Sequence, residues 1–409
     1  MKGHSKKNNA FEVVVIGAGP LGWACSHFLT KKSIRTCLID SETAHAAPEW
    51  MHRGLGVFWP SLNDPPTRAV VAHGPDMANF LQDFCLRGRS RAPDLLGTSS
   101  VREARTLRIA LEPHELVELQ KAAKNHLGLA ESEENNQQIF TEKANAWVLT
   151  SEGKSFLKSN QSSYLTTVQG TVTTLEDSID GCRILCADGS SFTSEMVIVA
   201  TGHRIPQLEP WLTQMLIPMS DILSIWSTNL PASNDKQPLA LRTSSGHVAC
   251  VFIPEKNSTG ACSWVLKMTG PRFLLPQAGA GVDLSQNIPD ELLKIQIETW
   301  LKKNLIPKVA PFISEKDFAA DKKIEIKLKH IGFGVDCLPC DELPMLGELG
   351  RQGRVLSATG WLGCGWSAGF EAAAILSEII HSGQSSGLKP LLRPQRWRSG
   401  MNDGVTGMT

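Results

Sequence analysis

The chain has 409 residues, in which 41 lysines and arginines balance 41 acidic residues and 42% of the residues are hydrophobic. This length allows two or three domain equivalents with a large core. A formal net charge of zero lacks the basic bias of a dedicated nucleic-acid binder, so we expect no nucleic-acid partner.

We expect no segment that spans a membrane or directs secretion. The longest apolar runs, such as residues 13–16 and 196–200, are much shorter than the roughly 20 residues that cross a bilayer. The first ten residues lack the apolar region of a secretory signal. The ten cysteines are scattered, as is typical of reduced thiols, so we expect a cytoplasmic protein.

The first strand and turn predict a dinucleotide site. Residues 12–16 form a short, nearly all-apolar run rich in β-branched side chains, which predicts a buried parallel strand. A glycine signature follows it directly, with the residues Gly17, Gly19, Pro20, Leu21 and Gly22. Gly17 suits a tight turn, Gly19 lets the backbone approach a pyrophosphate, and Gly22 allows the next helix to pack on the strand.

The next segments continue this pattern. Residues 21–29 predict a helix whose N-terminus favours the charged pyrophosphate. Residues 35–39 predict a second strand that ends in Asp40, followed by Ser41. An acid at this point binds the ribose 2′-hydroxyl and disfavours NADP. Strand, glycines, helix, strand and acid in this order indicate a Rossmann-like domain.

The middle of the chain predicts an insertion and then a β-meander. Residues 41–66 are loop-like, residues 67–87 have helical periodicity, and residues 89–163 are assigned to a substrate-facing domain. Alternating residues after Val168 predict strands that end in Ala200-Thr201-Gly202. Small residues there permit close backbone approach to a nucleotide.

A third glycine-rich segment lies near the C-terminus. Residues 354–358 predict a strand, and residues 368–380 have the periodicity of a helix. Between them, Gly360, Gly363 and Gly365 allow the backbone to approach a planar ring.

Together these segments resemble the FAD-dependent oxidoreductases of the D-amino-acid oxidase type, which include glycine oxidase and monomeric sarcosine oxidase. The resemblance also rests on the segment CLPCDELPMLGEL, residues 337–349. It implies an α/β fold with a discontinuous Rossmann-like FAD-binding domain, residues 11–88, 164–225 and 328–387. An α+β substrate domain built on an antiparallel sheet would then comprise residues 89–163 and 226–327, with flexible tails at residues 1–10 and 388–409.

The resemblance implies oxidation of a C–N bond in a small-molecule amine or amino acid, with hydride transfer to the flavin, hydrolysis of the imine, and reoxidation by oxygen or another acceptor. The residues that it places at the FAD are Gly17, Gly19, Pro20, Leu21, Gly22, Asp40, Ser41, His52, Arg53, Gly54, Val172, Ala200, Thr201, Gly202, Gly360, Trp361, Gly363, Cys364 and Gly365.

Three residues are candidates for catalysis. Lys267, in VLKMTG, matches the lysine that monomeric sarcosine oxidase places by the flavin for reaction with oxygen; the alternative is an ordinary lysine at a strand end. Arg53 lies where relatives place residues on the flavin and on a substrate carboxylate. Asp336 either attracts a cationic substrate or is a surface aspartate.

The chain departs from the family at several positions. The cysteine that bonds FAD covalently in sarcosine oxidase falls on Gly334, so we expect non-covalent FAD, although some relatives use a histidine near the position of His52. The carboxylate-binding arginine of glycine oxidase falls on or beside Asp336, and the corresponding lysine of sarcosine oxidase falls on Ser367. The usual carboxylate clamp is therefore not expected.

Other functions stay open. CLPCDELPMLG is also similar to the flavin-dependent half of the tRNA wobble-uridine modification enzyme, so the substrate could be a modified nucleoside or another amine that is not an amino acid. A non-catalytic flavin-fold binding protein is the alternative of another class. Cys337-x-x-Cys340 has the spacing of a redox or zinc motif, but no regular second ligand pair follows it, so we expect no metal.

Overall fold

The structure is a computed structural model of the chain. It describes residues 10–41, 54–125, 127–134, 137–150, 162–244, 248–256, 260–284, 287, 289–313, 324–350, 352–361, 363–383 and 388–402. The chain divides into two compact units: unit 1 comprises Met1–Trp50, Ser155–Ile217 and Cys337–Thr409, and unit 2 comprises Met51–Lys154 and Pro218–Asp336. The boundaries of the functional domains remain a prediction. No helix in the described part of the chain is long and apolar enough to cross a membrane.

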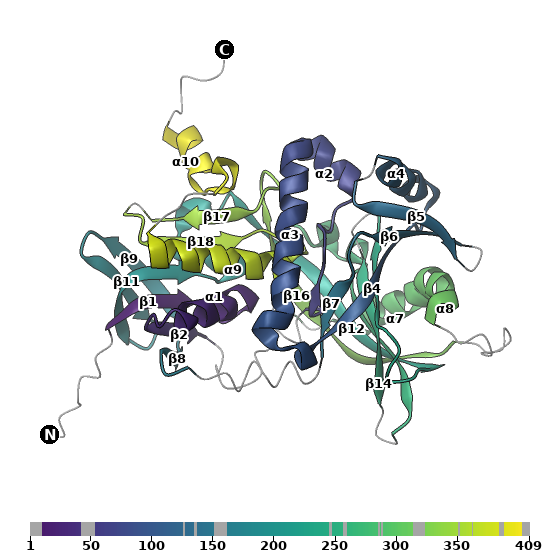
Figure 1. Cartoon of the computed structure of the whole chain (residues 1–409). Helices are drawn as coiled ribbons and strands as arrows, with labels where there is room; N and C mark the ends of the chain where they lie inside the picture. Colours follow the sequence, from purple (N-terminus) through teal and green to yellow (C-terminus); the bar gives the residue numbers. More distant parts are fainter. Residues whose placement is uncertain are drawn as a thin grey trace, which may run out of the picture. The chain divides into compact units, whose positions relative to one another are not determined.

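Unit 1 is built on an eight-stranded sheet in which the order β17-β18-β11-β1-β2-β8 is extended by β10 and β9 (Figure 1). Its strands are β1 (Ala10–Ile16), β2 (Thr36–Asp40), β8 (Leu165–Gln169), β9 (Val172–Ser178), β10 (Gly181–Cys186), β11 (Ser191–Val199), β17 (Met345–Glu348) and β18 (Val355–Thr359). Strands β18, β11, β1, β2 and β8 run parallel to one another, whereas β17 pairs with β18 and β10 with β11 in the antiparallel direction. The five therefore have their carboxyl ends at one edge of the sheet, the usual ligand edge of such folds.

Two helices pack against each other in this unit, α1 (Pro20–Lys31) and α9 (Gly365–Ser382) (Figure 1). Small buried residues line both helices, among them Gly22, Ala24, Ala368, Gly369 and Ala372. Small side chains allow two helix backbones to approach closely. Short helical segments follow β11: η3 (Gly202–Arg204), α6 (Ile205–Leu208) and η4 (Pro210–Leu212).

The C-terminal segment from residue 388 to 402 contains two helical segments, in the region where the sequence predicts a flexible tail. It forms η8 (Pro390–Leu392) and α10 (Gln395–Asn402). Arg396 donates hydrogen bonds to both carboxylate oxygens of Asp341, at 2.7 and 3.1 Å, and Trp397 Nε1 donates to the same carboxylate. Composition alone does not reveal such long-range bonds.

Unit 2 contains a ten-stranded sheet in the order β16-β12-β15-β14-β13-β4-β6-β5, with β7 paired to β4 and β3 paired to β7. Its strands are β3 (Val57–Phe58), β4 (Val101–Ile109), β5 (Leu129–Glu134), β6 (Gln137–Glu142), β7 (Ala146–Leu149), β12 (Leu216–Pro231), β13 (Leu239–Thr243), β14 (Ala249–Lys256), β15 (Cys262–Thr269) and β16 (Ile326–Pro339). The central strands β12, β15, β14 and β13 are antiparallel, so the expected fold class is confirmed.

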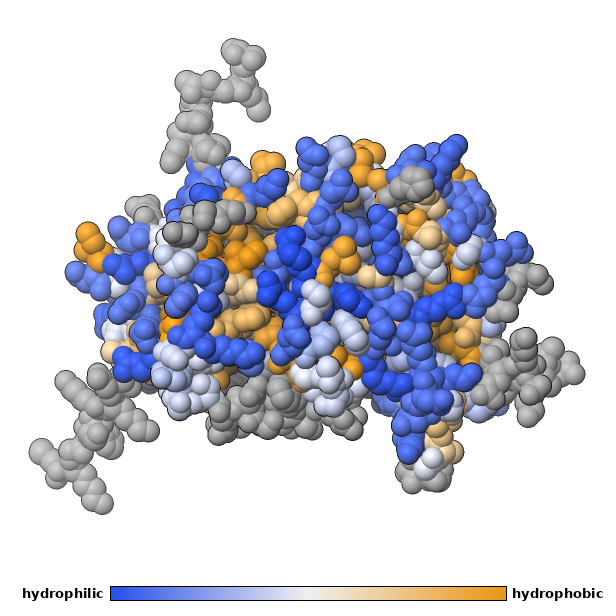
Figure 2. Space-filling model, in the orientation of Figure 1, coloured by the Kyte–Doolittle hydropathy of each residue, from blue (hydrophilic) through white to orange (hydrophobic). Residues whose placement is uncertain are grey.

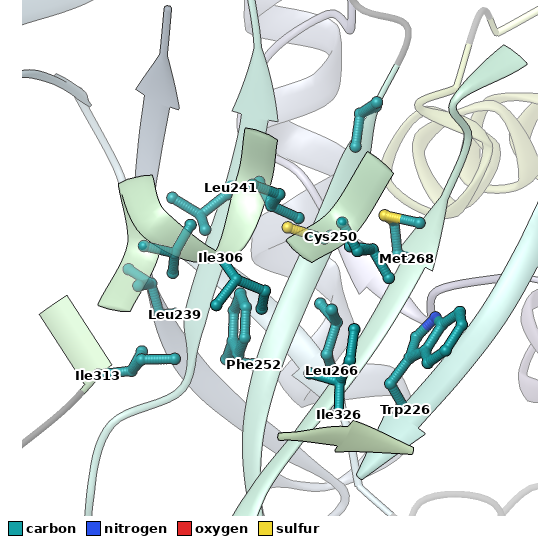
Figure 3. Close-up of a cluster of buried hydrophobic side chains, with 14 of the residues drawn as sticks. Trp226, Leu239, Leu241, Cys250, Phe252, Leu266, Met268, Ile306, Ile313 and Ile326 are labelled. Carbon is teal, nitrogen blue, oxygen red and sulfur yellow. The ribbon is translucent and has the colours of Figure 1, made fainter. Parts of the chain in front are cut away.

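Alternate residues of β14 enter two different cores. Cys250 and Phe252 join a cluster with Leu301, Ile306 and other side chains of the segment 291–313 (Figure 3). That segment comprises α7 (Glu291–Trp300), a π-helical turn η7 (Leu301–Leu305) and α8 (Ile306–Ile313). Residues 249, 251 and 253 face the opposite side of the sheet, where they pack with β3 and β7 in a second cluster.

The remaining helices of unit 2 are α2 (Pro66–His73), α3 (Pro75–Leu96), η2 (Thr98–Ser100), α4 (Pro113–Lys124), η5 (Arg272–Leu274) and η6 (Pro276–Gly279). The view in Figure 2 shows hydrophilic residues interspersed with smaller hydrophobic areas. The described residues with well exposed large apolar side chains include Val71, Ile179, Phe273, Leu292 and Ile295. Scattered residues of this kind are normal on protein surfaces.

Candidate functional site

The glycine signature is shaped by two close contacts inside unit 1. Gly17 has φ 99°, and a Cβ added to it would lie 2.7 Å from the Ala200 carbonyl oxygen. A Cβ on Gly22 would lie 1.8 Å from the Gly17 carbonyl oxygen. A Cβ on Gly19 would meet no atom within 4 Å. The fold itself therefore requires Gly17 and Gly22, whereas a small residue at position 19 leaves open space beside the N-terminus of α1.

Pro20 and Leu21 begin α1 directly after Gly19, which is the N-cap residue and makes no side-chain capping bond. The first backbone amides of a helix have no partner within the helix and bind anions well. The start of α1 can thus hold a phosphate group next to the open space at Gly19.

Asp40 lies beside this turn. Its carboxylate Oδ2 accepts a hydrogen bond of 2.6 Å from the backbone N–H of Ala18. The next residue, Ser41, is exposed. On the other side, the Gly170 N–H donates to the Asp40 carbonyl at 2.8 Å, and Val172 follows two residues later at the start of β9. The predicted ribose-binding acid and Val172 are therefore both near the carboxyl end of β2.

Residues 200–202, which follow β11, lie beside the glycine turn at the same edge of the sheet. The Ala200 N–H donates to the Ile16 carbonyl at 2.8 Å, which fixes the segment beside the glycine turn. Thr201 Oγ1 is buried and has no hydrogen-bond partner in the described part of the chain. Gly202 has φ 59° and open space where a Cβ would point. A buried hydroxyl without a partner in this turn fits a polar ligand bound at the edge.

The C-terminal turn lies at the same edge, between β18 and α9. Gly360 has φ 81°, and an added Cβ would lie 2.3 Å from Pro339 Cγ. Trp361 and Cys364 are buried, and the Cys364 N–H donates to the Trp361 carbonyl at 2.9 Å. Gly363 also has a positive φ, and Gly365 begins α9 with open space around its Cβ position. A second helix N-terminus thus faces the edge.

The structure therefore brings four sequence-distant segments of unit 1 to the carboxyl edge of one parallel sheet: residues 17–22, residues 40–41, residues 200–202, and residues 360–361 with 363–365. Two helix N-termini, an acid and several glycines suit a dinucleotide with a pyrophosphate. These residues fit FAD. His52 and Arg53 lie outside the described residues, and Gly54 belongs to unit 2.

In unit 2, Lys267 lies on β15 opposite Ile225 of β12 and Val251 of β14. Its side chain is only 14% exposed, and its Nζ is 3.6 Å from the Glu255 carboxylate, which is 47% exposed. Lys267 is thus a largely buried cation with a partly solvated counter-ion. Its position on the face of Val251 and Leu223 distinguishes it from a lysine that projects freely into solvent.

Asp336, on β16, is half-buried and acts electrostatically on Asp221 of β12. Burial raises the pKa of Asp221 to about 7, with Arg272 opposing this shift and Asp336 adding to it. Asp221 is not among the residues predicted from the sequence. A lone acid in the apolar run LIPMSDILSIW is the signal that could have identified it, because a charge in such a strand needs a reason.

Two further predictions concern other groups. Ser367, for which the sequence resemblance predicts a carboxylate-binding position of the family, is fully buried in α9. Cys337 is buried and Cys340 exposed, and neither is in a disulfide bond. The described residues contain no group of three or more His, Cys, Asp or Glu side chains that could hold a metal ion.

Comparisons with known proteins agree with this geometry. The family model described as FAD dependent oxidoreductase matches residues 12–379. No curated protein sequence matches significantly. Among solved structures, glycine oxidase from Geobacillus kaustophilus is 14% identical with a TM-score of 0.66 and covers 94% of this chain and 98% of its own.

Two other similar structures are described as enzymes with activities that differ from that of glycine oxidase. L-proline dehydrogenase from P. horikoshii is 13% identical with a TM-score of 0.63 and covers 96% of this chain and 98% of its own. Fructosyl amine:oxygen oxidoreductase from Aspergillus fumigatus is 13% identical with a TM-score of 0.66 and covers 97% of this chain and 92% of its own. At these identities the likeness concerns the fold.

Proposed function

Because this chain belongs to the family of FAD-dependent oxidoreductases, we propose that it oxidises a C–N bond of a small-molecule amine or amino acid. The single observation that carries this proposal is the meeting of residues 17–22, 40–41, 200–202 and 360–365 at one edge of a parallel sheet. When bound there, FAD supplies the acceptor for a hydride from the carbon next to nitrogen.

We assign separate tasks to the residues at this edge. The N-terminus of α1 binds the pyrophosphate, with Gly19 leaving room for it. Asp40 binds the ribose, and the Thr201 hydroxyl supplies a hydrogen bond to the cofactor. The turn from Gly360 to Gly365 presents backbone to the flavin end. Lys267 acts in reoxidation, with oxygen or another molecule as the acceptor.

We infer the class of substrate from the descriptions of the solved relatives and from the positions at which this chain differs from the family. Solved relatives are described as acting on glycine, L-proline or a fructosyl amine, all of which contain a carbon–nitrogen bond. Ser367 is fully buried and Asp336 is an acid, so neither replaces the basic residue that binds a carboxylate in relatives. An amine without an essential carboxylate is therefore favoured.

The experiment is the absorbance spectrum of the purified protein, followed by anaerobic mixing with N-methyl amino acids, D-amino acids and simple amines. We expect flavin bands and bleaching of these bands by at least one compound, because bleaching does not depend on the acceptor. A colourless protein that FAD does not reconstitute would contradict the enzyme and favour a binding protein. Bleaching only by modified nucleosides would favour the nucleoside alternative.

We further propose that FAD is held without a covalent bond, since Gly334 has no nucleophilic side chain. Acid or heat precipitation should release the flavin into the supernatant. Flavin that stays with the precipitate would instead implicate another residue such as His52.

A further inference from the structure

The C-terminal helix α10 holds residues 339–343, which we call the proline turn, through one aspartate. Arg396 donates to both carboxylate oxygens of Asp341, from Nε to Oδ2 at 2.7 Å and from Nη2 to Oδ1 at 3.1 Å. Trp397 Nε1 donates to Asp341 Oδ2 at 2.9 Å, and Arg396 Nη2 also donates to the Leu343 carbonyl at 2.8 Å. A contact of this kind between a guanidinium and a carboxylate fixes orientation as well as distance.

The pair of Arg396 and Asp341 is partly shielded from water. The side chain of Arg396 is 9% exposed and that of Asp341 is 33% exposed. Burial opposes the ionisation of Asp341, but the hydrogen bonds and the charge of Arg396 outweigh it and lower the pKa of Asp341. The carboxylate is therefore ionised at neutral pH, and the contact is an ion pair that water screens only in part.

The proline turn packs on the C-terminal turn of the cofactor edge, residues 360–361 with 363–365. A Cβ added to Gly360 would lie 2.3 Å from Pro339 Cγ and 2.8 Å from Pro339 Cδ, so the proline ring lies directly against this glycine. The Glu342 N–H donates to the Pro339 carbonyl at 3.0 Å and closes the proline turn. The chain then enters β17, which pairs with β18 directly before Gly360. The proline turn and β17 therefore hold the start of the C-terminal turn.

Two arginines of α10 hold opposite ends of β17. Because β17 is antiparallel to β18, it begins at the carboxyl edge of the sheet and ends at the other side. Arg396 holds the proline turn, which precedes β17 at the carboxyl edge. Arg398 instead donates to the Leu349 carbonyl, after β17, at 2.8 Å and lies 4.5 Å from the centre of the Trp211 ring. All of these residues belong to unit 1, and only Arg396 acts at the end of β17 that is close to the cofactor edge.

We infer that Arg396 and Asp341 are positioning residues for FAD: through Pro339 they fix the C-terminal turn in the conformation that receives the flavin end. This inference rests on the proposed place of the flavin end at that turn. A turn that is ordered before binding loses less entropy when the ligand arrives, so its rigidity contributes to affinity. The pyrophosphate and the ribose bind at residues 17–22 and Asp40, which α10 does not hold through the proline turn.

The first test compares the binding of FAD and of ADP to the apoproteins by calorimetry, at a temperature at which circular dichroism shows each variant to be folded. ADP carries the adenine, ribose and pyrophosphate of FAD but has no flavin. Arg396→Gln should bind FAD about tenfold more weakly than wild type and should bind ADP as wild type does. Arg398→Gln is the matched control: it removes the same charge from the same helix and should keep wild-type affinity for both ligands.

The difference between the two ligands separates positioning from general destabilisation. An Arg396→Gln protein that loses affinity for FAD and ADP equally, or that keeps wild-type affinity for FAD, would overturn the inference. Arg396→Lys keeps a cation beside the carboxylate and should recover part of the lost FAD affinity. If Arg396→Gln does not fold, Asp341→Asn makes the same test, because it removes the charge and keeps an oxygen for the Leu343 N–H.

The second test asks whether the effect passes through Pro339. Pro339→Ala removes the ring that lies against Gly360, so it should also weaken FAD binding about tenfold and leave ADP binding unchanged. Residues that act through one contact are not additive, so the double variant of Arg396→Gln and Pro339→Ala should lose about as much as either single variant. Losses that multiply to about a hundredfold would overturn the route through Pro339.

The outcomes separate this inference from the proposed function. If the wild-type apoprotein binds no FAD, both fail. If it binds FAD but no amine bleaches the flavin, the proposed reaction fails, and the affinities of the variants still decide the role of Arg396 and Asp341. If amines bleach the flavin and Arg396→Gln binds FAD as wild type does, only the positioning role fails.

Discussion

Lys267 and Glu255 form an ion pair whose two members differ in exposure, 14% for the lysine and 47% for the glutamate. The solvated end is screened by water, so Glu255 neutralises Lys267 only in part. A largely buried ammonium group in this position can stabilise negative charge that develops on a nearby molecule such as oxygen. The ion pair is thus compatible with the role in reoxidation that we propose.

We predict that Lys267→Met leaves amine-driven bleaching largely intact but slows reoxidation by air by about two to three orders of magnitude. Removing one well-placed charge commonly costs roughly 3–4 kcal/mol of transition-state stabilisation. Glu255→Gln is the matched variant: it removes the counter-ion and should reoxidise at least as fast as wild type. Stopped-flow absorbance under air measures both rates.

Two results would contradict this prediction. A Lys267→Met protein that reoxidises at the wild-type rate would make Lys267 an ordinary strand-end lysine. Slow reoxidation of the wild type itself would identify a dehydrogenase that uses another acceptor.

At the scale of elements, the glycines of the turn between β1 and α1 have two different roles: Gly22 is required by the fold, and Gly19 leaves space for the cofactor. The Cβ of an alanine at position 22 would overlap the Gly17 carbonyl, whereas the Cβ at position 19 would meet no protein atom. Gly22→Ala should therefore destabilise the apoprotein by about 3 kcal/mol or more. Gly19→Ala should leave apoprotein stability unchanged and weaken FAD binding about tenfold or more.

Denaturant unfolding of the apoproteins and FAD titration followed by flavin fluorescence measure these two effects. Gly19 has φ −62°, which alanine adopts without strain, so backbone strain does not complicate the comparison. Wild-type FAD affinity in Gly19→Ala would show that the cofactor does not approach this backbone.

The sequence predicts the elements around the cofactor well because their signals are local. A strand, three glycines and a helix follow each other within residues 10–31, and the structure has them there. Long-range polar contacts leave no such local signal.

Two buried arginines of unit 2 are examples. Arg108, fully buried in β4, donates to Glu142 of β6 at 3.0 Å and to the Asn63 carbonyl. Arg242 of β13 donates to the Ser61 carbonyl at 2.9 Å. Neither arginine is predicted as a core residue, since arginines are rarely buried without partners.

At the scale of the whole molecule, the sequence predicts the FAD-dependent family and the mixed α/β class correctly. The sequence does not predict the helical C-terminal segment, residues 388–402, or the electrostatic environment of Asp221. The contact of Arg396 with Asp341 and the electrostatic coupling of Asp221 to Arg272 and Asp336 each join residues at least 50 positions apart. Such pairs arise only when the chain has folded, so periodicity and composition do not reveal them.

The net charge of the chain, formally zero at pH 7, becomes positive as pH falls and histidines become protonated. His27, in α1, stacks on Trp23 with ring centroids 5.4 Å apart. Burial, together with the smaller effect of the nearby charge of Lys31, lowers the pKa of His27 from 6.5 to about 4. The unfolded chain therefore binds a proton at His27 between pH 6.5 and 4 while the folded protein does not. Stability falls as pH decreases through this window.

We predict that the thermal midpoint of wild type falls between pH 6.5 and 4, and that His27→Gln, which cannot become charged, reduces this fall. Lys31→Met should reduce it less, because it removes only the smaller cause of the lowered pKa. Glu209 acts in the opposite direction: burial raises its pKa despite the hydrogen bond from Trp211, so its protonation favours the folded state as pH falls. Differential scanning calorimetry at half-unit pH intervals measures the three curves. Identical slopes for wild type and His27→Gln would show that acid sensitivity of the protein arises elsewhere.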